Sequence, residues 1–308
     1  MKTLGRRRGS TIGIVLLGYS LIAACTPQSG PTTSNNRGSH AEATYKTAPN
    51  EVVSQGDKAL AEKEYLRALN RYEEASKEVN EKIQASALNR MGELYERGLG
   101  VGRDYKRSYD LYQKSAILGN HYGQANLANG LFFGVGTERN LPEALVWAQK
   151  GAEGDVPMAI NQVGWQFLNG MGVHVDATEA QRQYAHSAAL GDPTGEFQLG
   201  WVYAHVDPID YQLAMQWYKK ASDQNSERAE SNIGYLYENG LGVARDYAHA
   251  ASWYQVAATA GFPRAQFHLG SLYDLGHGVP HDAAKARELM QKAADGGDDE
   301  ASHWLSTH

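Results

Sequence analysis

The chain has 308 residues, with 29 Lys and Arg against 35 Asp and Glu, so its formal net charge at pH 7 is −6. This acidic surplus disfavours nonspecific binding to nucleic acid, because the phosphate backbone is itself negative. The single cysteine, Cys25, excludes disulfides within the chain and excludes a catalytic thiol at any other position.

The first 24 residues have the pattern of a secretion signal. Four basic residues, Lys2 and the arginines at 6–8, precede the apolar run TIGIVLLGYSLIAA at residues 11–24. This run is shorter than the roughly 20 residues of a membrane span. The sequence Ile22-Ala23-Ala24-Cys25 resembles a bacterial lipobox, which implies cleavage before Cys25 and lipidation of that residue. The alternative is an ordinary cleaved signal followed by an unmodified cysteine.

Residues 25–50 are rich in Ser, Thr, Asn, Gly and Pro, and we expect them to form a flexible tether of roughly 25–30 Å. Removal of residues 1–24 leaves 25 Lys and Arg against 35 Asp and Glu, a net charge of −10. An anionic lipid surface repels such a body, so the lipid on Cys25 is the expected membrane contact. Thr26 after the lipidated cysteine favours an outer-membrane lipoprotein facing the periplasm, if the cell is Gram-negative.

Beyond residue 80 the chain repeats with a period close to 36 residues. One marker is a pair of glycines, and another is a column of Asp or Asn residues at steps of 36, 36, 34, 36 and 36. Asp and Asn accept hydrogen bonds from the free N–H groups at a helix start, so the column predicts the N-cap of a second helix in each unit. The column consists of Asp104, Asn140, Asp176, Asp210, Asp246 and Asp282.

A first helix is expected upstream of each glycine pair, with a glycine in its middle. Glycine at that place costs up to about 1 kcal/mol relative to alanine, so it predicts a close helix crossing. The mid-helix positions are Gly92, Gly164, Gly200, Gly234 and Gly270, with Ala128 as the exception. Helix pairs of this kind bury both faces only when they stack, which predicts an α-solenoid.

The run SNIGYLYENGLGVARDYAHAASWYQVAATAG resembles a Sel-like repeat, a relative of the tetratricopeptide repeat. The resemblance implies an all-α fold, a right-handed α-solenoid of stacked antiparallel helix pairs. Residues 85–298 are expected to form six such units, preceded by a tetratricopeptide-like unit with a shorter loop at 51–84. Residues 299–308 are expected to form a capping helix over the last unit.

The sequence contains little that indicates an enzyme or a metal-binding protein. No H-E-x-x-H or G-x-S-x-G motif is present, so we expect no catalytic residues and no cofactor. His268, His277 and His281 cluster near two aspartates, but Asp282 already belongs to the capping column, and we assign no metal site.

In each repeat unit, two positions of the first helix carry mostly polar or aromatic residues. One lies two residues before the mid-helix glycine, and the other lies one residue after it. In tetratricopeptide relatives the corresponding positions line the concave groove, so the resemblance implies a partner-binding groove. Its predicted residues are Asn126, Asn129, Gln162, Trp165, Gln198, Trp201, Asn232 and Tyr235. The alternative for Trp165 and Trp201 is packing between units.

The expected function is that of a membrane-anchored interaction scaffold in the bacterial envelope, which binds one or more proteins in its groove. The resemblance extends to lipoproteins of exopolysaccharide export and envelope assembly. The alternative is an immunity protein that neutralises a secreted antibacterial effector, since an acidic groove suits a basic toxin. Neither nucleic acid nor a small-molecule substrate is expected.

Overall fold

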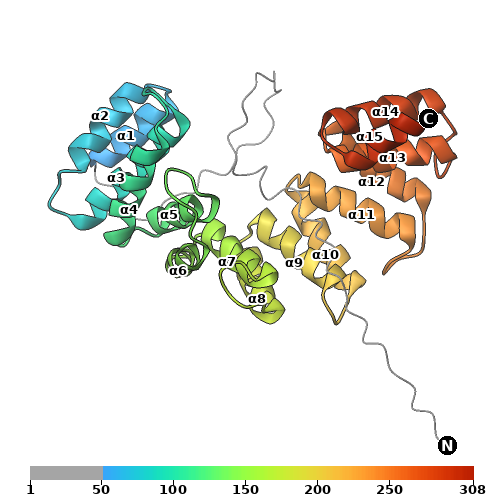
Figure 1. Ribbon diagram of the computed structural model, residues 1–308, viewed down its shortest axis with the longest axis horizontal. Coiled ribbons are helices and arrows are strands. Elements are labelled where there is room, and N and C mark those ends of the chain that lie inside the picture. The colour runs from blue at the N-terminus through green and yellow to red at the C-terminus, as the bar shows by residue number, and fades with distance from the viewer. Residues whose placement is uncertain (1–50) are drawn as a thin grey trace, which may run out of the picture. The chain divides into compact units, whose positions relative to one another are not determined.

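The computed structural model describes residues 51–308 and contains, in this range, fifteen α-helices and no strand (Figure 1). The all-α fold is therefore confirmed. The signal peptide, the tether and Cys25 lie outside the described residues. The helices are α1 (Glu51–Ala61), α2 (Tyr65–Ala75), α3 (Glu81–Arg97), α4 (Tyr105–Ile117), α5 (His121–Phe133), α6 (Leu141–Ala152), α7 (Pro157–Asn169), α8 (Ala177–Ala189), α9 (Pro193–His205), α10 (Tyr211–Asp223), α11 (Glu227–Asn239), α12 (Tyr247–Thr259), α13 (Pro263–Leu275), α14 (Ala283–Asp295) and α15 (Asp299–Thr307).

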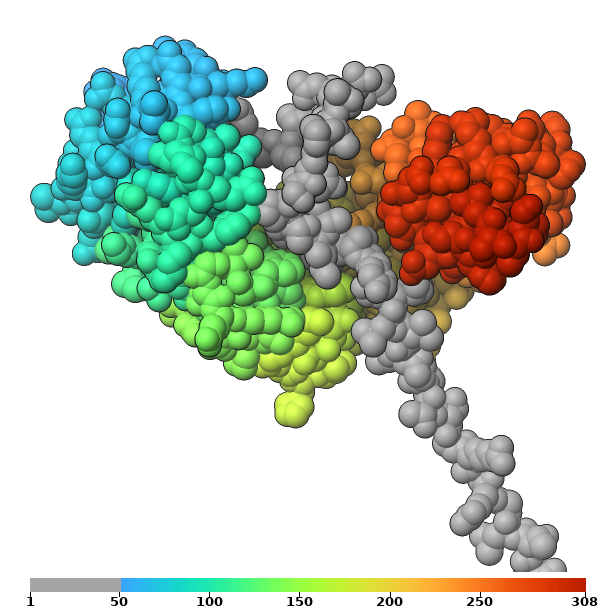
Figure 2. Space-filling model, turned by 45° about the horizontal axis from the view of Figure 1, so that its top comes forward, coloured from blue at the N-terminus to red at the C-terminus, as the bar shows by residue number. Residues whose placement is uncertain are grey.

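Each helix packs on the next helix in the chain, and the odd-numbered helices are the first helices of their units. Consecutive first helices from α1 to α9 also contact one another directly, so they form one layer of the stack. In Figure 2 the chain-order colours follow one another along residues 51–308, because each unit contacts its sequence neighbours. This arrangement confirms the predicted α-solenoid.

The predicted capping column is confirmed at all six positions. Each side chain accepts a hydrogen bond from a backbone N–H in the first turn of the helix that it precedes. Asp104, for example, accepts from the Arg107 N–H at 2.9 Å, and Asp282 accepts from the Lys285 N–H at 2.9 Å. The column therefore fixes the start of every second helix from α4 to α14.

The glycine pairs form the turns that end the first helices. At the last pair, Gly276 has φ +66° and its N–H donates to the Leu272 carbonyl, which closes α13. Gly278 has φ +70°, and a Cβ there would lie 2.3 Å from the backbone of Tyr247. The first glycine thus provides the left-handed C-cap, and the second permits close approach of the preceding unit.

The mid-helix glycines make room for tyrosine rings of the second helix. A Cβ at Gly92 would lie 2.6 Å from the Tyr112 ring, and a Cβ at Gly164 would lie 2.8 Å from the Tyr184 ring. The predicted close crossing is therefore confirmed, and the contact is between a ring and a backbone. Ala128, the exception among the glycines, belongs to a buried cluster with Ala148, which stands at the tyrosine position of α6.

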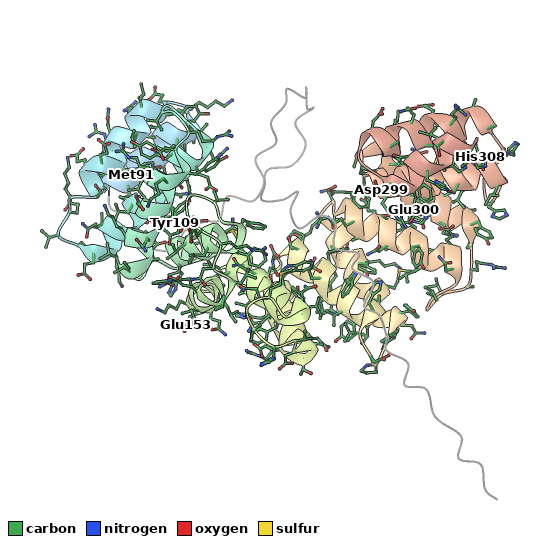
Figure 3. The ribbon with its side chains drawn as sticks, viewed as in Figure 1. Met91, Tyr109, Glu153, Asp299, Glu300 and His308 are labelled. Carbon is green, nitrogen blue, oxygen red and sulfur yellow. The ribbon has the colours of Figure 1, made fainter. Side chains whose placement is uncertain are left out.

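The last helix, α15, packs on α14 and buries Ala301 against Met290 and Ala293. Asp298 caps it by accepting from the Ala301 N–H at 2.9 Å. Asp299 and Glu300 begin α15 and His308 follows its last residue (Figure 3), and all three side chains are exposed. Within residues 51–308, no helix is long and apolar enough to cross a membrane.

Candidate functional site

Three consecutive first helices each present an aromatic side chain one residue after the mid-helix glycine. Trp165 of α7 and Trp201 of α9 are half-buried, and Tyr235 of α11 is 43 % exposed. One turn later each helix carries an exposed uncharged polar side chain that hydrogen-bonds the carbonyl of the aromatic residue, at 2.9, 2.9 and 3.0 Å. We call these six residues the aromatic strip: Trp165, Asn169, Trp201, His205, Tyr235 and Asn239.

The two tryptophans are held in place by their neighbours. Trp165 packs against a buried cluster that includes Leu127 and Leu131 of the preceding unit. The Trp201 ring stacks on the His205 ring with centroids 4.4 Å apart and an interplanar angle of 15°. Part of each indole thus contributes to packing within the solenoid, and the exposed remainder is available to a partner.

The strip itself contains no Asp, Glu, Lys or Arg. At the equivalent positions of α3 stand Glu93 and Arg97, and Glu93 accepts from the Arg90 guanidinium at 3.2 Å. At the equivalent positions of α13 stand Ser271 and Leu275. The aromatic ring one residue after the mid-helix glycine therefore distinguishes α7, α9 and α11 from the other first helices of residues 85–298, and the uncharged strip is suited to a partner surface that is itself uncharged.

The polar column two residues before the glycine connects neighbouring units. The Arg90 Nε lies 3.1 Å from Asp57 Oδ1 of the preceding unit. The Asn126 amide donates to Asn89 Oδ1 at 2.9 Å, and the Gln162 amide donates to the Ala128 carbonyl at 3.2 Å. These side chains thus satisfy polar groups between first helices.

The predicted groove residues differ in how much surface they offer. Gln162 and Gln198 are 9 % and 4 % exposed, whereas Asn126, Asn129 and Asn232 are half-buried. Gln198 stands three residues before Trp201 on the same helix face. The binding role of these side chains stays a prediction.

Sequence reasoning missed a set of buried tyrosine hydroxyls near the first-helix layer. Tyr112 donates to Glu96 at 2.6 Å, and Tyr254 donates to Glu238 at 2.6 Å. The Tyr184 hydroxyl is buried without a partner among the described residues, and Leu168 takes the position of the carboxylate. Burial raises the pKa of Tyr184. The signal was present in the sequence as an acidic residue four places after the mid-helix glycine.

The three histidines of the last unit have separate neighbours. His268 Nδ1 lies 3.5 Å from Glu238, the His277 ring packs on Tyr247 with centroids 4.7 Å apart, and His281 Nδ1 lies 2.7 Å from the Asp274 carbonyl oxygen. In the described part of the chain, no group of three or more His, Cys, Asp or Glu side chains could hold a metal ion.

Five windows of the sequence match the family model described as Sel1 repeat, at residues 85–120, 121–156, 193–226, 228–262 and 263–298. The chain belongs to the Sel1 repeat family. Sel1 repeats are generally non-enzymatic modules that bind other proteins. Residues 157–192 lie outside the matched windows, although α7 and α8 form the same helix pair as in the other units.

Two solved structures of Sel1-type proteins are similar to this chain. A protective antigen present in uropathogenic Escherichia coli strains, which displays an SLR fold, is 30% identical, with a TM-score of 0.72 over 81% of this chain and 54% of that chain. A Sel1 repeat protein from Oxalobacter formigenes is 28% identical, with a TM-score of 0.71 over 79% of this chain and 99% of that chain.

Among curated proteins, chitin synthase regulatory factor 3 of Schizosaccharomyces pombe is 34% identical over 120 residues, which is 37% of this chain and 13% of that protein. The human protein sel-1 homolog 2 is 23% identical over 183 residues, which is 59% of this chain and 27% of that protein. The chain thus spans about a quarter or less of the length of these relatives.

Proposed function

We propose that this Sel1 repeat protein is an envelope lipoprotein that holds partner proteins at the membrane through its first-helix layer. The observation that carries the proposal is the aromatic strip on α7, α9 and α11, where uncharged side chains remain partly exposed on consecutive units. Half-exposed aromatic residues supply the contact area that dominates many protein interfaces. The membrane part of the proposal rests on the lipobox-like sequence that ends at Cys25.

The family supports the adaptor role, since Sel1 repeats generally bind proteins. The curated relative of Schizosaccharomyces pombe is described as a regulatory factor of a synthase, which fits a module that acts on another protein. The net charge of −10 expected after signal removal favours partners that are neutral or basic.

The test is capture of partners from detergent-solubilised envelope with the full chain as bait. Trp201→Ala and Asn232→Ala are compared with Trp304→Ala on α15. Trp304 is the matched control, because its ring stacks on His308 four residues later with centroids 4.5 Å apart, as Trp201 stacks on His205. We expect the Trp201→Ala and Asn232→Ala variants to lose partners that the Trp304→Ala control retains.

Two results would decide the role. Capture of a set of envelope-assembly proteins supports the scaffold, whereas one dominant basic secreted protein supports the inhibitor alternative. Equal capture by the native chain and both groups of variants would contradict binding through the first-helix layer.

A further inference from the structure

We propose that a basic edge of the first two units faces the anionic lipid surface of the membrane and orients the anchored solenoid on it. The proposal rests on the proposed function, because the lipid anchor at Cys25 is what brings this edge to the membrane. The basic edge consists of six exposed cations on α2, α3, α4 and the loops before α2 and α4: Lys63, Arg67, Arg97, Arg103, Lys106 and Arg107.

The charge of the described chain is distributed unevenly along its units. Residues 51–120 carry 12 Lys and Arg against 12 Asp and Glu, whereas residues 121–308 carry 11 against 22. The negative surplus therefore lies entirely in the units that follow α4. An anionic surface repels those later units more strongly than it repels the first two.

Within the first two units the positive charge gathers at the turn between α3 and α4. Residues 97–110 contain four basic and two acidic side chains, a net charge of +2. Asp104 is engaged in the N-cap of α4, and Asp110 lies 2.5 Å from Lys106 Nζ. With histidine neutral, the same window of the later units has a net charge between −2 and 0, at residues 133–146, 169–182, 205–216, 239–252 and 275–288.

The first unit extends this basic turn. A Cβ at Gly100 would lie 2.6 Å from the Tyr65 Cβ, so the loop between α3 and α4 lies directly against the first turn of α2. The two segments meet at an open hollow of about 390 Å³, lined by Lys63, Glu64, Tyr65, Leu66, Arg67 and Gly100. Leu66 is 63 % exposed there. Basic side chains around an exposed leucine suit the boundary between lipid headgroups and acyl chains.

Two arginines of the basic edge are supported by tyrosine rings. The Arg107 guanidinium lies 4.2 Å from the centroid of the Tyr95 ring, and the Arg103 guanidinium lies 5.9 Å from that of Tyr105. A guanidinium on an aromatic face stays charged and keeps N–H groups for other acceptors. Lipid phosphates are acceptors of this kind, and arginine binds them with two parallel hydrogen bonds.

The order of the chain favours a lipid surface over an acidic protein as the partner. α1 begins at Glu51, so the basic edge belongs to the first units after the expected tether that starts at Cys25. A flexible tether of roughly 25–30 Å keeps the two surfaces at a high effective concentration.

The attraction is local to this edge. Each Lys or Arg close to an anionic lipid surface favours contact by about fivefold, and the effect falls off within a Debye length of about 8 Å. The body as a whole, with its negative surplus, is still repelled. The basic edge therefore orients the anchored chain and does not replace the lipid as its attachment.

The experiment measures amine labelling of the full chain, isolated from the envelope and reconstituted in vesicles of phosphatidylcholine, with or without phosphatidylglycerol. Mass spectrometry reads the label at each lysine. We expect Lys63 and Lys106 to be labelled at least about threefold less on the anionic vesicles, and salt of roughly 1 M should abolish this protection. Lys292 of α14 should be labelled equally on both. It is the matched control for Lys106, because each pairs with a carboxylate four residues away.

The triple variant Arg103→Gln/Lys106→Gln/Arg107→Gln should restore the labelling of Lys63 on anionic vesicles. Glutamine is nearly as good a helix former as arginine and lysine, so the helices should persist. Unchanged labelling on neutral vesicles separates loss of lipid contact from unfolding. The control is Arg245→Gln, because Arg245 lies over Tyr247 as Arg103 lies over Tyr105, at 5.5 Å from the ring centroid. This control should keep the protection of Lys63.

Equal labelling of Lys63 and Lys106 on the two kinds of vesicle would overturn the proposal. Protection by soluble polyglutamate without protection by anionic vesicles would also overturn it, in favour of an acidic protein partner. The two proposals fail in different ways. A chain that does not enter vesicles contradicts the lipid anchor and the orientation together, whereas a chain that enters them and is labelled equally contradicts the orientation alone.

Discussion

The Tyr254 ring of α12 lies against the backbone of Gly234 in α11, so closely that a Cβ at Gly234 would be 2.7 Å from the ring. Tyr254 is fully buried, and its hydroxyl reaches past the glycine to donate to Glu238 at 2.6 Å. The glycine thus admits the largest buried side chain of the unit, and this packing holds the two helices of the pair together.

Gly234→Ala should therefore destabilise the protein, although alanine is the better helix former. Overpacking costs about 1–3 kcal/mol, against a helix propensity gain of about 1 kcal/mol, so we expect a net loss of roughly 1 kcal/mol. The urea unfolding midpoint measures this. Gly102→Ala is the control, because a Cβ there meets nothing within 4 Å.

The double variant Gly234→Ala/Tyr254→Ala tests the cause. Removal of the ring alone should be costly, because it leaves a cavity, but the added methyl group should then no longer destabilise. The chain already contains this combination as Ala128 and Ala148 in one cluster. If the Gly234→Ala change still destabilises the protein when the ring is absent, the contact with Tyr254 is not the origin of the penalty.

Much of this architecture could be predicted from the sequence, because its determinants are local. The capping column and the glycine turns act within a few residues of one helix end. The contact partner of Gly234 was missed, since it requires the pairing of two helices in space. The burial of Gln162 was missed for the same reason: its amide donates to the Ala128 carbonyl of the preceding unit.

The aromatic strip could be predicted only in part from the sequence. Trp165, Trp201 and Tyr235 could be selected by their period, but periodicity alone does not separate an exposed ring face from a packed one. The stacking of Trp201 on His205 depends on side-chain directions that a single sequence does not specify.

Replacement of a capping residue tests how much the N-cap hydrogen bond stabilises the second helix of a unit. Asp282→Ala should destabilise α14 by about 1 kcal/mol, because the Lys285 N–H loses its acceptor. Asp282→Asn should be nearly neutral, since Asn140 caps α6 in the same way. Thermal unfolding of both variants measures the difference. An equal loss in the two would assign the effect to the carboxylate charge.

Two glutamates of α11 should give opposite pH dependences. Glu230 is buried, and burial followed by the nearby Glu227 raises its pKa. A carboxyl group whose pKa is higher in the folded state than in the unfolded state destabilises the folded protein at pH values above the folded pKa. This free-energy penalty disappears below the unfolded pKa of about 4.3. Glu230→Gln should therefore stabilise the protein at pH 7 and lose this advantage near pH 4, as measured by urea unfolding across pH.

Glu238 of the same helix should show the opposite pH dependence to Glu230. Burial raises its pKa, but hydrogen bonds from His268 and Tyr254 outweigh burial, and the pKa lies below the usual value. Its contribution is present above the unfolded pKa and is lost as the pH falls through the folded pKa. Glu238→Gln should destabilise at pH 7 and approach the native chain in acid. A pH-independent effect in both variants would contradict these assignments.

The membrane attachment of the chain should depend on Cys25. Cys25→Ala should move the protein from the membrane pellet to the soluble fraction, because the acidic body has no attraction to an anionic surface. The native chain should resist a wash with roughly 1 M salt, in which the Debye length falls to about 3 Å and charge-based contacts are released. Release of the native chain by salt, or a Cys25→Ala variant that stays in the pellet, would contradict lipid anchoring at this residue.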